Sequence, residues 1–248
     1  MRFLVIALML VPWGLSGQSA FEIVQESDQK MRGRNSKGTT TIQIVRPKYT
    51  REMKMVNWTL GDDYALVLIL EPKKDEGSAF LKREKEIWNW VPNIERTIKL
   101  PPSMMTQNWM GTDFTNDDLV KQSSIVVDYT HEIVSEEKVN GLNCWKIELT
   151  PKPEAAVVWG KILIWIDQAD FMQMKVEFYD EDDFLVNTLS GSEPKEFDGQ
   201  LLPSRLEMIP AEKPGNKTVM ITNTLDFNID IAESFFTTRN MRSVKSTD

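Results

Sequence analysis

Few side chains in this sequence are able to carry covalent catalysis. The chain has one histidine, His131, and one cysteine, Cys144. A hydrolase or transferase needs a nucleophile beside a base, most often Ser, Cys or Asp with a histidine close by. Both residues stand in segments that read as strands, and Cys144 alternates with Trp145 and Ile147, so we interpret them as ordinary strand residues. We expect no catalytic residue and therefore no enzyme.

Acidic side chains gather at two places that could in principle bind calcium or act as paired carboxylates. One place holds Asp113, Asp117 and Asp118, and the other is residues 180–183. Neither has the spacing of an EF-hand loop, and Asp bonds readily to backbone N–H groups, so turn and cap roles are favoured. The spacings of zinc and haem ligands and Gly-rich phosphate loops are also missing from the sequence. We expect no metal and no cofactor.

The first residues predict an exported protein. Residues 1–20 carry one positive charge, an apolar run and then small residues, the order typical of a cleavable secretory signal. The run is too short to span a bilayer. Cleavage after Gly17, Ser19 or Ala20 would each leave a small residue at the cut. We expect residues 21–248 to form a single domain.

Composition limits the protein's stabilising forces and its partners. One cysteine makes no internal disulfide, so stability must come from a core built from the 41% of residues that are hydrophobic. The formal net charge is -8, and loss of Arg2 with the signal makes it about -9. Because an acidic chain repels phosphate backbones and anionic headgroups, we expect no nucleic-acid partner and no stable binding to a membrane surface.

Hydrophobic periodicity predicts one N-terminal helix followed by many strands. Residues 21–31 have helical spacing, and residues 232–239 read as a short final helix. Between them, segments of alternating apolar and polar residues predict strands. These segments are 40–45, 51–55, 64–70, 79–82, 86–91, 95–100, 125–132, 144–149, 161–166, 171–179, 184–189, 201–209 and 218–229. Short turns separate most of them, so we expect an antiparallel meander with 79–82 and 86–91 as a hairpin.

The alternation places soft and aromatic side chains on shared faces. Met172, Met174, Val176 and Phe178 are expected on one side of their strand. Residues 64–70 are apolar on both sides, so something must cover the outer one. Such stripes are most often solid core, but more than about eight strands leave room for a ligand. A filled core and a lipid-holding hollow therefore both remain open.

Four segments of the sequence have a distinctive composition. They are residues 77–82, 87–92, 95–100 and, most specifically, 109–119, which read WMGTDFTNDDL. Together they resemble the LolA-like outer-membrane lipoprotein-sorting proteins. The likeness in order and type of segments extends from residue 21 to about residue 239. It implies a mainly β protein with a few short helices (α+β), folded as a half-open antiparallel β-barrel covered by helices. In such carriers an arginine of the barrel holds the lid closed, and Arg46 and Arg51 are the candidates.

The resemblance also implies a function. It implies a monomeric periplasmic carrier that takes acyl chains of lipoproteins, or another lipid, from an inner-membrane transporter to an outer-membrane acceptor. The alternative is an accessory module of an RND-type envelope transporter that binds lipid or docks protein without lipoprotein cargo.

We assign candidate residues to this carrier interpretation. The lid comprises residues 21–31 and 104–119, with apolar members Phe21, Val24, Met31, Met104, Met105, Trp109, Met110 and Phe114. The face lining the ligand cavity is predicted from side chains of the alternating strands. They are Met53, Met55, Leu66, Leu68, Trp88, Trp90, Trp145, Met172, Met174, Val176, Phe178, Leu225 and Phe227.

Overall fold

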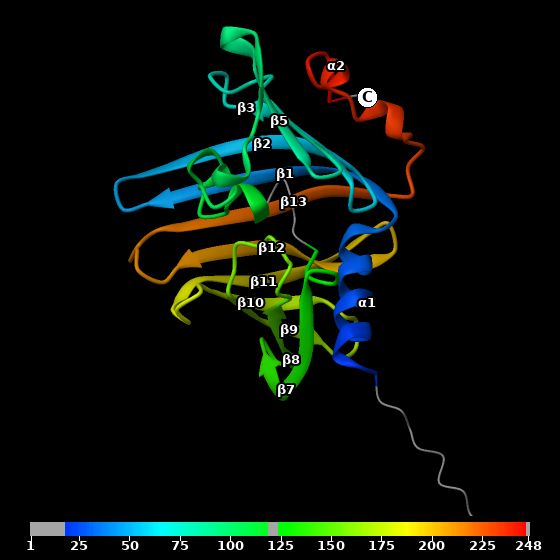
Figure 1. Ribbon diagram of the computed structural model, residues 1–248, viewed down its shortest axis with the longest axis vertical. Helices are drawn as coiled ribbons and strands as arrows, with labels where there is room; N and C mark the ends of the chain where they lie inside the picture. The colour runs from blue at the N-terminus through cyan, green and yellow to red at the C-terminus, as the bar shows by residue number, and fades with distance from the viewer. Residues whose placement is uncertain (1–17, 119–123, 247–248) are drawn as a thin grey trace, which may run out of the picture.

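The computed structural model describes residues 18–118 and 124–246, and its described part is built on one curved antiparallel sheet (Figure 1). The sheet has 13 strands in the described residues, in the order β6-β5-β4-β3-β2-β1-β13-β12-β11-β10-β9-β8-β7. The strands are β1 Asn35–Arg46, β2 Tyr49–Leu60, β3 Tyr64–Glu71, β4 Ala79–Arg83, β5 Glu86–Val91, β6 Arg96–Lys99, β7 Tyr129–Val139, β8 Leu142–Pro151, β9 Lys161–Asp167, β10 Gln173–Tyr179, β11 Leu185–Phe197, β12 Gln200–Pro210 and β13 Lys217–Phe227. The predicted mainly β, unclosed architecture is confirmed.

Strand order explains why the sheet stays open. Strands that are neighbours in sequence pair as the predicted meander requires, except β6 and β7, and the first strand, β1, pairs with the last, β13. The edges are β6 and β7. The chain between these edges does not extend the sheet. Residues 101–118 instead fold against one face of it, with short 3-10 turns at Pro102–Met104 and Trp109–Gly111.

Helix α1, Ala20–Arg32, confirms the predicted N-terminal helix. Its start is fixed by a capping box, in which the Ser19 side chain accepts from the Glu22 backbone and Glu22 accepts from the Ser19 backbone. Its end comes at Gly33, whose φ of 63° favours glycine. Ile23 and Val24 are fully buried against the β7–β9 end of the sheet.

Alternation along the strands gives the sheet two apolar faces. In β2, Met53 and Met55 pack in one cluster, whereas Val56 and Trp58 pack in another. Side chains two apart share a face of a strand and neighbours do not, so these clusters lie on opposite faces. We call the face that carries Met53 the inner face and the opposite one the outer face.

The C-terminal segment, residues 228–244, covers the outer face of β2 to β5. It contains a 3-10 turn, Glu233–Phe235, and the short helix α2, Thr238–Met241, in place of the single predicted helix. Phe236 and Met241 are buried against Leu66 and Leu68 of β3. Figure 1 shows this red segment beside the β3–β5 end of the sheet. The C-terminal segment is therefore the cover that the apolar outer side of residues 64–70 was predicted to require.

Two predictions about the strands are wrong in detail. Strand β7 begins at Tyr129, because residues 125–128 form a turn in which Val127 and Asp128 donate backbone hydrogen bonds to the Ser124 carbonyl. Met172 and Met174 do not share a face with Val176 and Phe178.

A bulge explains the second error. The pairing of β10 with β9 shifts between Gln173 and Lys175, and a bulge changes which face the following side chains take. Met174 consequently packs with Trp165 on the outer face, whereas Val176 packs with Ile164 on the inner face.

Candidate ligand-binding site

The inner face presents two adjoining apolar clusters. The first is built on β1 to β5 and the second on β7 to β10, and Val158 packs against both. Buried members from the sheet in the first cluster are Ile42, Ile44, Met53, Met55, Val67, Ile69, Phe80 and Ile87. Those in the second are Tyr129, Ile147, Leu149, Ile162, Ile164, Ile166 and Val176. One apolar surface thus extends across the concave side of the sheet.

Residues 101–118, which we call the cover loop, lie over the first cluster. Met105 and Trp109 are buried in it, and the Trp109 ring lies 5.2 Å from that of Phe80, centroid to centroid. The loop closes on itself, since Trp109 N donates to the Phe114 carbonyl and Asn116 N to the Gln107 carbonyl, both at 2.9 Å or less. A loop that satisfies its own backbone can move as one unit.

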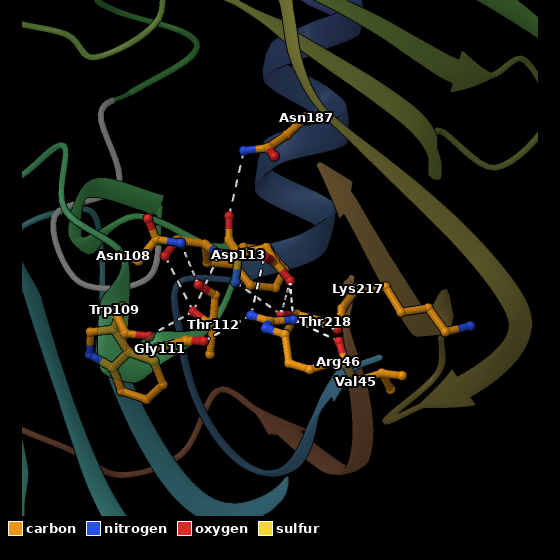
Figure 2. Close-up of polar contacts among 11 residues, drawn as sticks. Val45, Arg46, Asn108, Trp109, Gly111, Thr112, Asp113, Asn187, Lys217 and Thr218 are labelled. Atoms are coloured by element: carbon orange, nitrogen blue, oxygen red, sulfur yellow. Dashed lines mark hydrogen bonds and ion pairs between the residues drawn. The ribbon is translucent and has the colours of Figure 1, made fainter. Parts of the chain in front are cut away.

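A single compact group of polar contacts joins the cover loop to the sheet (Figure 2). Arg46, at the end of β1, donates from Nη1 to Asp113 Oδ2 at 2.9 Å and from Nη2 to Asp113 Oδ1 at 3.2 Å. Its Nη2 also donates to the Gly111 carbonyl at 2.9 Å. Such a two-pronged guanidinium–carboxylate pair is strong and directional. We call Arg46, Gly111, Asp113 and Thr218 the polar junction.

Thr218 on β13 completes the junction. Its hydroxyl donates to Asp113 Oδ2 at 2.6 Å and accepts from the Asp113 backbone N–H at 2.9 Å. Asn187 on β11 donates to the Asp113 carbonyl at 3.5 Å. Asp113 is 4% exposed and Thr218 0%. Burying a charged carboxylate is costly, and here a guanidinium and a hydroxyl offset that cost by hydrogen bonding to it.

The other candidate arginine does not contact the cover loop. Arg51 pairs with Asp75 at 3.3 Å, in the turn between β3 and β4, and lies 2.8 Å from the Met53 sulfur. Of the two arginines named from the sequence, Arg46 is therefore the one placed to hold the loop closed.

A second polar contact fixes the far end of the cover loop. Trp159 Nε1 donates to Asp118 Oδ1 at 3.1 Å, and Thr115 N donates to Asp118 Oδ2 at 2.8 Å. Burial raises the pKa of the Asp118 carboxyl, and these hydrogen bonds oppose that rise. Asp118 thus has the capping role that the sequence favoured for these acidic residues, whereas Asp113 forms a buried ion pair that the sequence interpretation did not predict.

Helix α1 covers the second cluster and is held by contacts at its C-terminal half. Ser27 donates to the Phe171 carbonyl at 2.7 Å, and Lys30 donates to the Asp170 carbonyl. Asp28 pairs with Arg32 at 2.9 Å. Burial raises the pKa of Asp28, while the Arg32 charge works to lower it.

The structure divides the predicted cavity residues among three places. The inner face carries Met53, Met55, Trp145, Val176 and Phe178. The outer face carries Leu66, Leu68, Trp88, Trp90, Met172 and Met174. Leu225 and Phe227 lie in a small separate cluster with Phe197, Leu202 and Met31.

The predicted lid residues lie over the inner face with two exceptions, Phe21 and Met31, and Met31 packs in the separate cluster of Phe197, Leu202 and Phe227. Val24, Met105, Trp109 and Phe114 are buried, and Met104 and Met110 pack partly buried against the first cluster. Phe21 is 45% exposed and stacks edge-on with His131 at 5.7 Å. Leu119, at the end of the predicted lid, lies outside the described residues, as do residues 1–17 of the predicted signal.

Several inner-face residues are missing from the sequence-based set. Ile42, Ile44, Val67, Ile69 and Phe80 all stand in strands that were predicted, and Ile42 and Ile44 alternate with polar residues in the sequence. Residues 64–70 are apolar at every position, so nothing in that segment indicated which side faces inward.

The residues considered for catalysis have structural roles. Cys144 is fully buried on the outer face, and burial raises the pKa of its thiol. His131 Nε2 lies 2.7 Å from the Ile125 carbonyl. Within the described part of the chain, no group of three His, Cys, Asp or Glu side chains is arranged to hold a metal, and no helix has the length and apolar character needed to cross a bilayer.

A polar cleft of about 450 Å³ lies beside α1, apart from the apolar face. Its walls come from the helix, the turn before β10 and the turn between β11 and β12. They are Glu26, Gln29, Lys30, Asp170, Glu196, Gly199, Gln200 and Leu201. In this closed arrangement the inner face itself is occupied by the side chains of α1 and the cover loop.

Solved structures with this fold define its class. A putative outer membrane lipoprotein-sorting protein domain from Vibrio parahaemolyticus is 24% identical, with a TM-score of 0.80 over 90% of this chain and 98% of that chain. A LolA superfamily protein from Nitrosomonas europaea is 22% identical, with a TM-score of 0.78 over 90% and 99%. A DUF1329 family protein from Desulfovibrio piger is 19% identical, with a TM-score of 0.82 over 90% and 97%. The fold is LolA-like, as the sequence resemblance predicted.

The family follows from the sequence. A family model described as "Uncharacterized protein" matches residues 61–243, and the chain belongs to that family. No curated protein matches the chain.

Proposed function

We propose that this protein is a periplasmic carrier that binds acyl chains of lipoproteins, or of another lipid, on its inner face and passes them towards the outer membrane. One observation carries the proposal. A continuous apolar face is closed over by two separate segments, α1 and the cover loop, and the cover loop is joined to the sheet mainly through the polar junction at Arg46 and Asp113. The LolA-like fold and the lipoprotein-sorting name of one similar structure support it.

The energetics of acyl chains require such a cover. Burying one CH₂ is worth about 0.8 kcal/mol, so a chain of about sixteen carbons gains roughly 12 kcal/mol if fully shielded. A rigid, empty, dry pocket would hold two such chains almost irreversibly. Side chains that fill the inner face when no lipid is bound must be displaced by cargo, and this offsets part of the gain. Binding then stays reversible, and a carrier can release what it holds.

The polar junction makes opening a defined event. Because Asp113 accepts from both Arg46 and Thr218, its contacts are lost together when the loop lifts. The exposed charges are then solvated, which limits the cost of opening. The cover loop and α1 are the proposed lid.

Export is part of the proposal. Cleavage after Gly17 would preserve the capping box of α1, whereas cleavage after Ser19 or Ala20 would remove its N-cap residue. We propose residues 1–17 as the signal, and a single monomeric carrier domain that receives cargo from an inner-membrane transporter and delivers it to an outer-membrane acceptor.

A reversible lock tests the lid directly. Asp113→Cys with Thr218→Cys, in a Cys144→Ala background, places two thiols where Thr218 Oγ1 now lies 2.9 Å from Asp113 N. Binding is followed by the quenching of tryptophan emission with a brominated diacyl lipid. We expect the oxidised protein to bind no lipid and the reduced protein to bind it. The control is the Cys144→Ala protein alone, treated with the same oxidant.

Two outcomes would contradict parts of the proposal. Equal lipid binding by the locked and reduced proteins would reject the cover loop as a lid. Absence of quenching in both, together with no lipid in mass spectra of protein purified from the cell envelope, would favour the alternative, a docking module of an envelope transporter.

A further inference from the structure

Two buried ring donors on the inner side of the sheet, a phenol O–H and an indole N–H, have no acceptor among the residues that the structure describes. Tyr129, the first residue of β7, is 1% exposed, and its hydroxyl has no partner among the residues that the structure describes. Trp109 in the cover loop is also 1% exposed, and its indole Nε1 lacks a partner within the same described residues. Buried donors in folded proteins are almost always bonded, so each unpaired group calls for a physical reason.

Equivalent groups elsewhere in this protein are bonded. The indole of Trp159 donates to Asp118 at 3.1 Å, and that of Trp165 donates to Glu137 at 2.9 Å. The Tyr179 hydroxyl donates to Glu177 at 2.8 Å. The two unpaired ring donors, by contrast, both lie where a proposed lid segment meets the inner face, Tyr129 beneath α1 and Trp109 in the cover loop itself. Tyr129 packs in the cluster under α1, and Trp109 packs against Phe80 in the cluster under the cover loop.

We propose that Tyr129 and Trp109 bind carbonyl oxygens of the cargo, which makes the cargo an ester- or amide-linked acyl lipid and not merely hydrocarbon. The inference rests on the proposed carrier function and names its ligand class. In the closed arrangement neither donor has an acceptor within residues 18–118 and 124–246. When acyl chains displace the covering side chains, the carbonyl at the head of a chain supplies the missing acceptor.

The charge around Tyr129 selects a neutral acceptor. Asp117, Asp118 and Asp128 lie close enough that their charges add to the effect of burial in raising the Tyr129 pKa. Asp118 already accepts from Trp159 and from the Thr115 backbone. A phosphate oxygen entering this site would meet these carboxylates and be repelled, whereas an ester carbonyl carries no net charge.

Matched lipids test the inference. Dioleoylglycerol has ester carbonyls and the corresponding dioleyl ether has none, and both can be brominated at their double bonds to quench tryptophan. We expect the wild-type protein to bind the ester about twenty-fivefold more tightly than the ether, the worth of two net hydrogen bonds of about fivefold each. Tyr129→Phe and Trp109→Phe should each lower this ratio to about fivefold, because each variant keeps the other donor.

Tyr179→Phe is the matched control. It removes a tyrosine hydroxyl that already has a hydrogen-bond partner, Glu177, and the preceding residue, Phe178, packs on the inner face. It should keep the wild-type ester preference. The melting temperature of Tyr129→Phe without lipid should not fall, since no hydrogen bond is lost. Equal binding of both lipids by the wild type, or an unchanged ester preference in Tyr129→Phe, would overturn the inference. Neither result would contradict the proposed carrier function. Failure of both lipids to bind would overturn the carrier as well.

Discussion

The two faces of the sheet are both covered by other parts of the chain, but the covers are fastened differently. On the outer face, the C-terminal segment is held by aromatic packing, with Phe236 fully buried and its ring 5.6 Å from that of Tyr64. On the inner face, the cover loop combines apolar contacts with the buried pair of Arg46 and Asp113. Apolar packing is non-directional and is lost gradually, whereas a buried ion pair is made or broken as a unit.

This difference separates a structural cover from a movable one. The ion pair of the outer cover, Arg83 with Glu233, is well exposed and contributes little. The buried pair of the inner cover adds less to stability than its geometry suggests, but it specifies one closed position. The comparison predicts that substitutions in the outer cover change stability, while those in the polar junction change lipid binding.

The largest effect is expected from removing the outer aromatic anchor. Phe236→Ala should lower the free energy of unfolding by about 3–5 kcal/mol, because it leaves a cavity in a fully buried cluster. Urea denaturation measures this loss. Lipid affinity should stay unchanged, since the inner face lies across the sheet. The control is Phe184→Ala, at a side chain that is 67% exposed. A fall in lipid affinity matching the fall in stability would remove the distinction between the two covers.

The next effect is expected at the polar junction. Arg46→Met should destabilise the closed cover loop by about 3 kcal/mol, because Asp113 keeps a buried charge without its cation. Less free energy is then needed to open the loop, so lipid affinity should rise about tenfold or more, and release should slow. Quenching titrations measure the affinity, and hydrogen exchange over residues 101–118 measures the opening. Arg51→Met, which removes a contact with Asp75 instead, should change neither quantity. Unchanged affinity in Arg46→Met would mean that the junction does not control binding.

A small effect is expected at the exposed ion pair. Glu233→Gln should lower the free energy of unfolding by at most about 1 kcal/mol, because both partners of the pair are exposed and screened by water. The loss should shrink in high salt. Chemical denaturation at two salt concentrations measures it. A loss as large as that of Phe236→Ala would show that charge, and not aromatic packing, fastens the outer cover.

The sequence predicted the elements better than it predicted their faces. Period-two alternation located every strand, and the non-alternating stretch after the two prolines corresponds to the cover loop, because both depend on local patterns. Face assignment depends on register, and a shift of one residue exchanges the two sides. Leu66 and Leu68 were assigned inward for this reason, although Val67 and Ile69 are the inner pair.

The polar junction could not be predicted from local sequence patterns. Arg46 was one of two candidates that the family resemblance provided, and Asp113 was interpreted only as a turn or cap residue. They meet because β1 pairs with β13, which brings Thr218 beside Arg46, and because the chain folds inward after β6. Contacts between residues so far apart in sequence depend on the whole topology, and no spacing rule predicts them.

The smallest effect concerns the contact of α1 with β7, where Phe21 packs on His131. Burial lowers the pKa of His131 from its ordinary value of 6.5, and Phe21 of α1 stacks on its ring. The unfolded chain therefore binds a proton more readily than the folded one. Stability from this residue is complete above pH 6.5 and declines as the pH falls through 6.5 towards the lowered folded value. His131→Gln should flatten the pH dependence of the melting temperature between about pH 7 and pH 5, and carboxylates supply the dependence that remains. If the melting temperatures of wild type and variant fall equally over this range, protonation of His131 does not weaken the packing of α1 on β7.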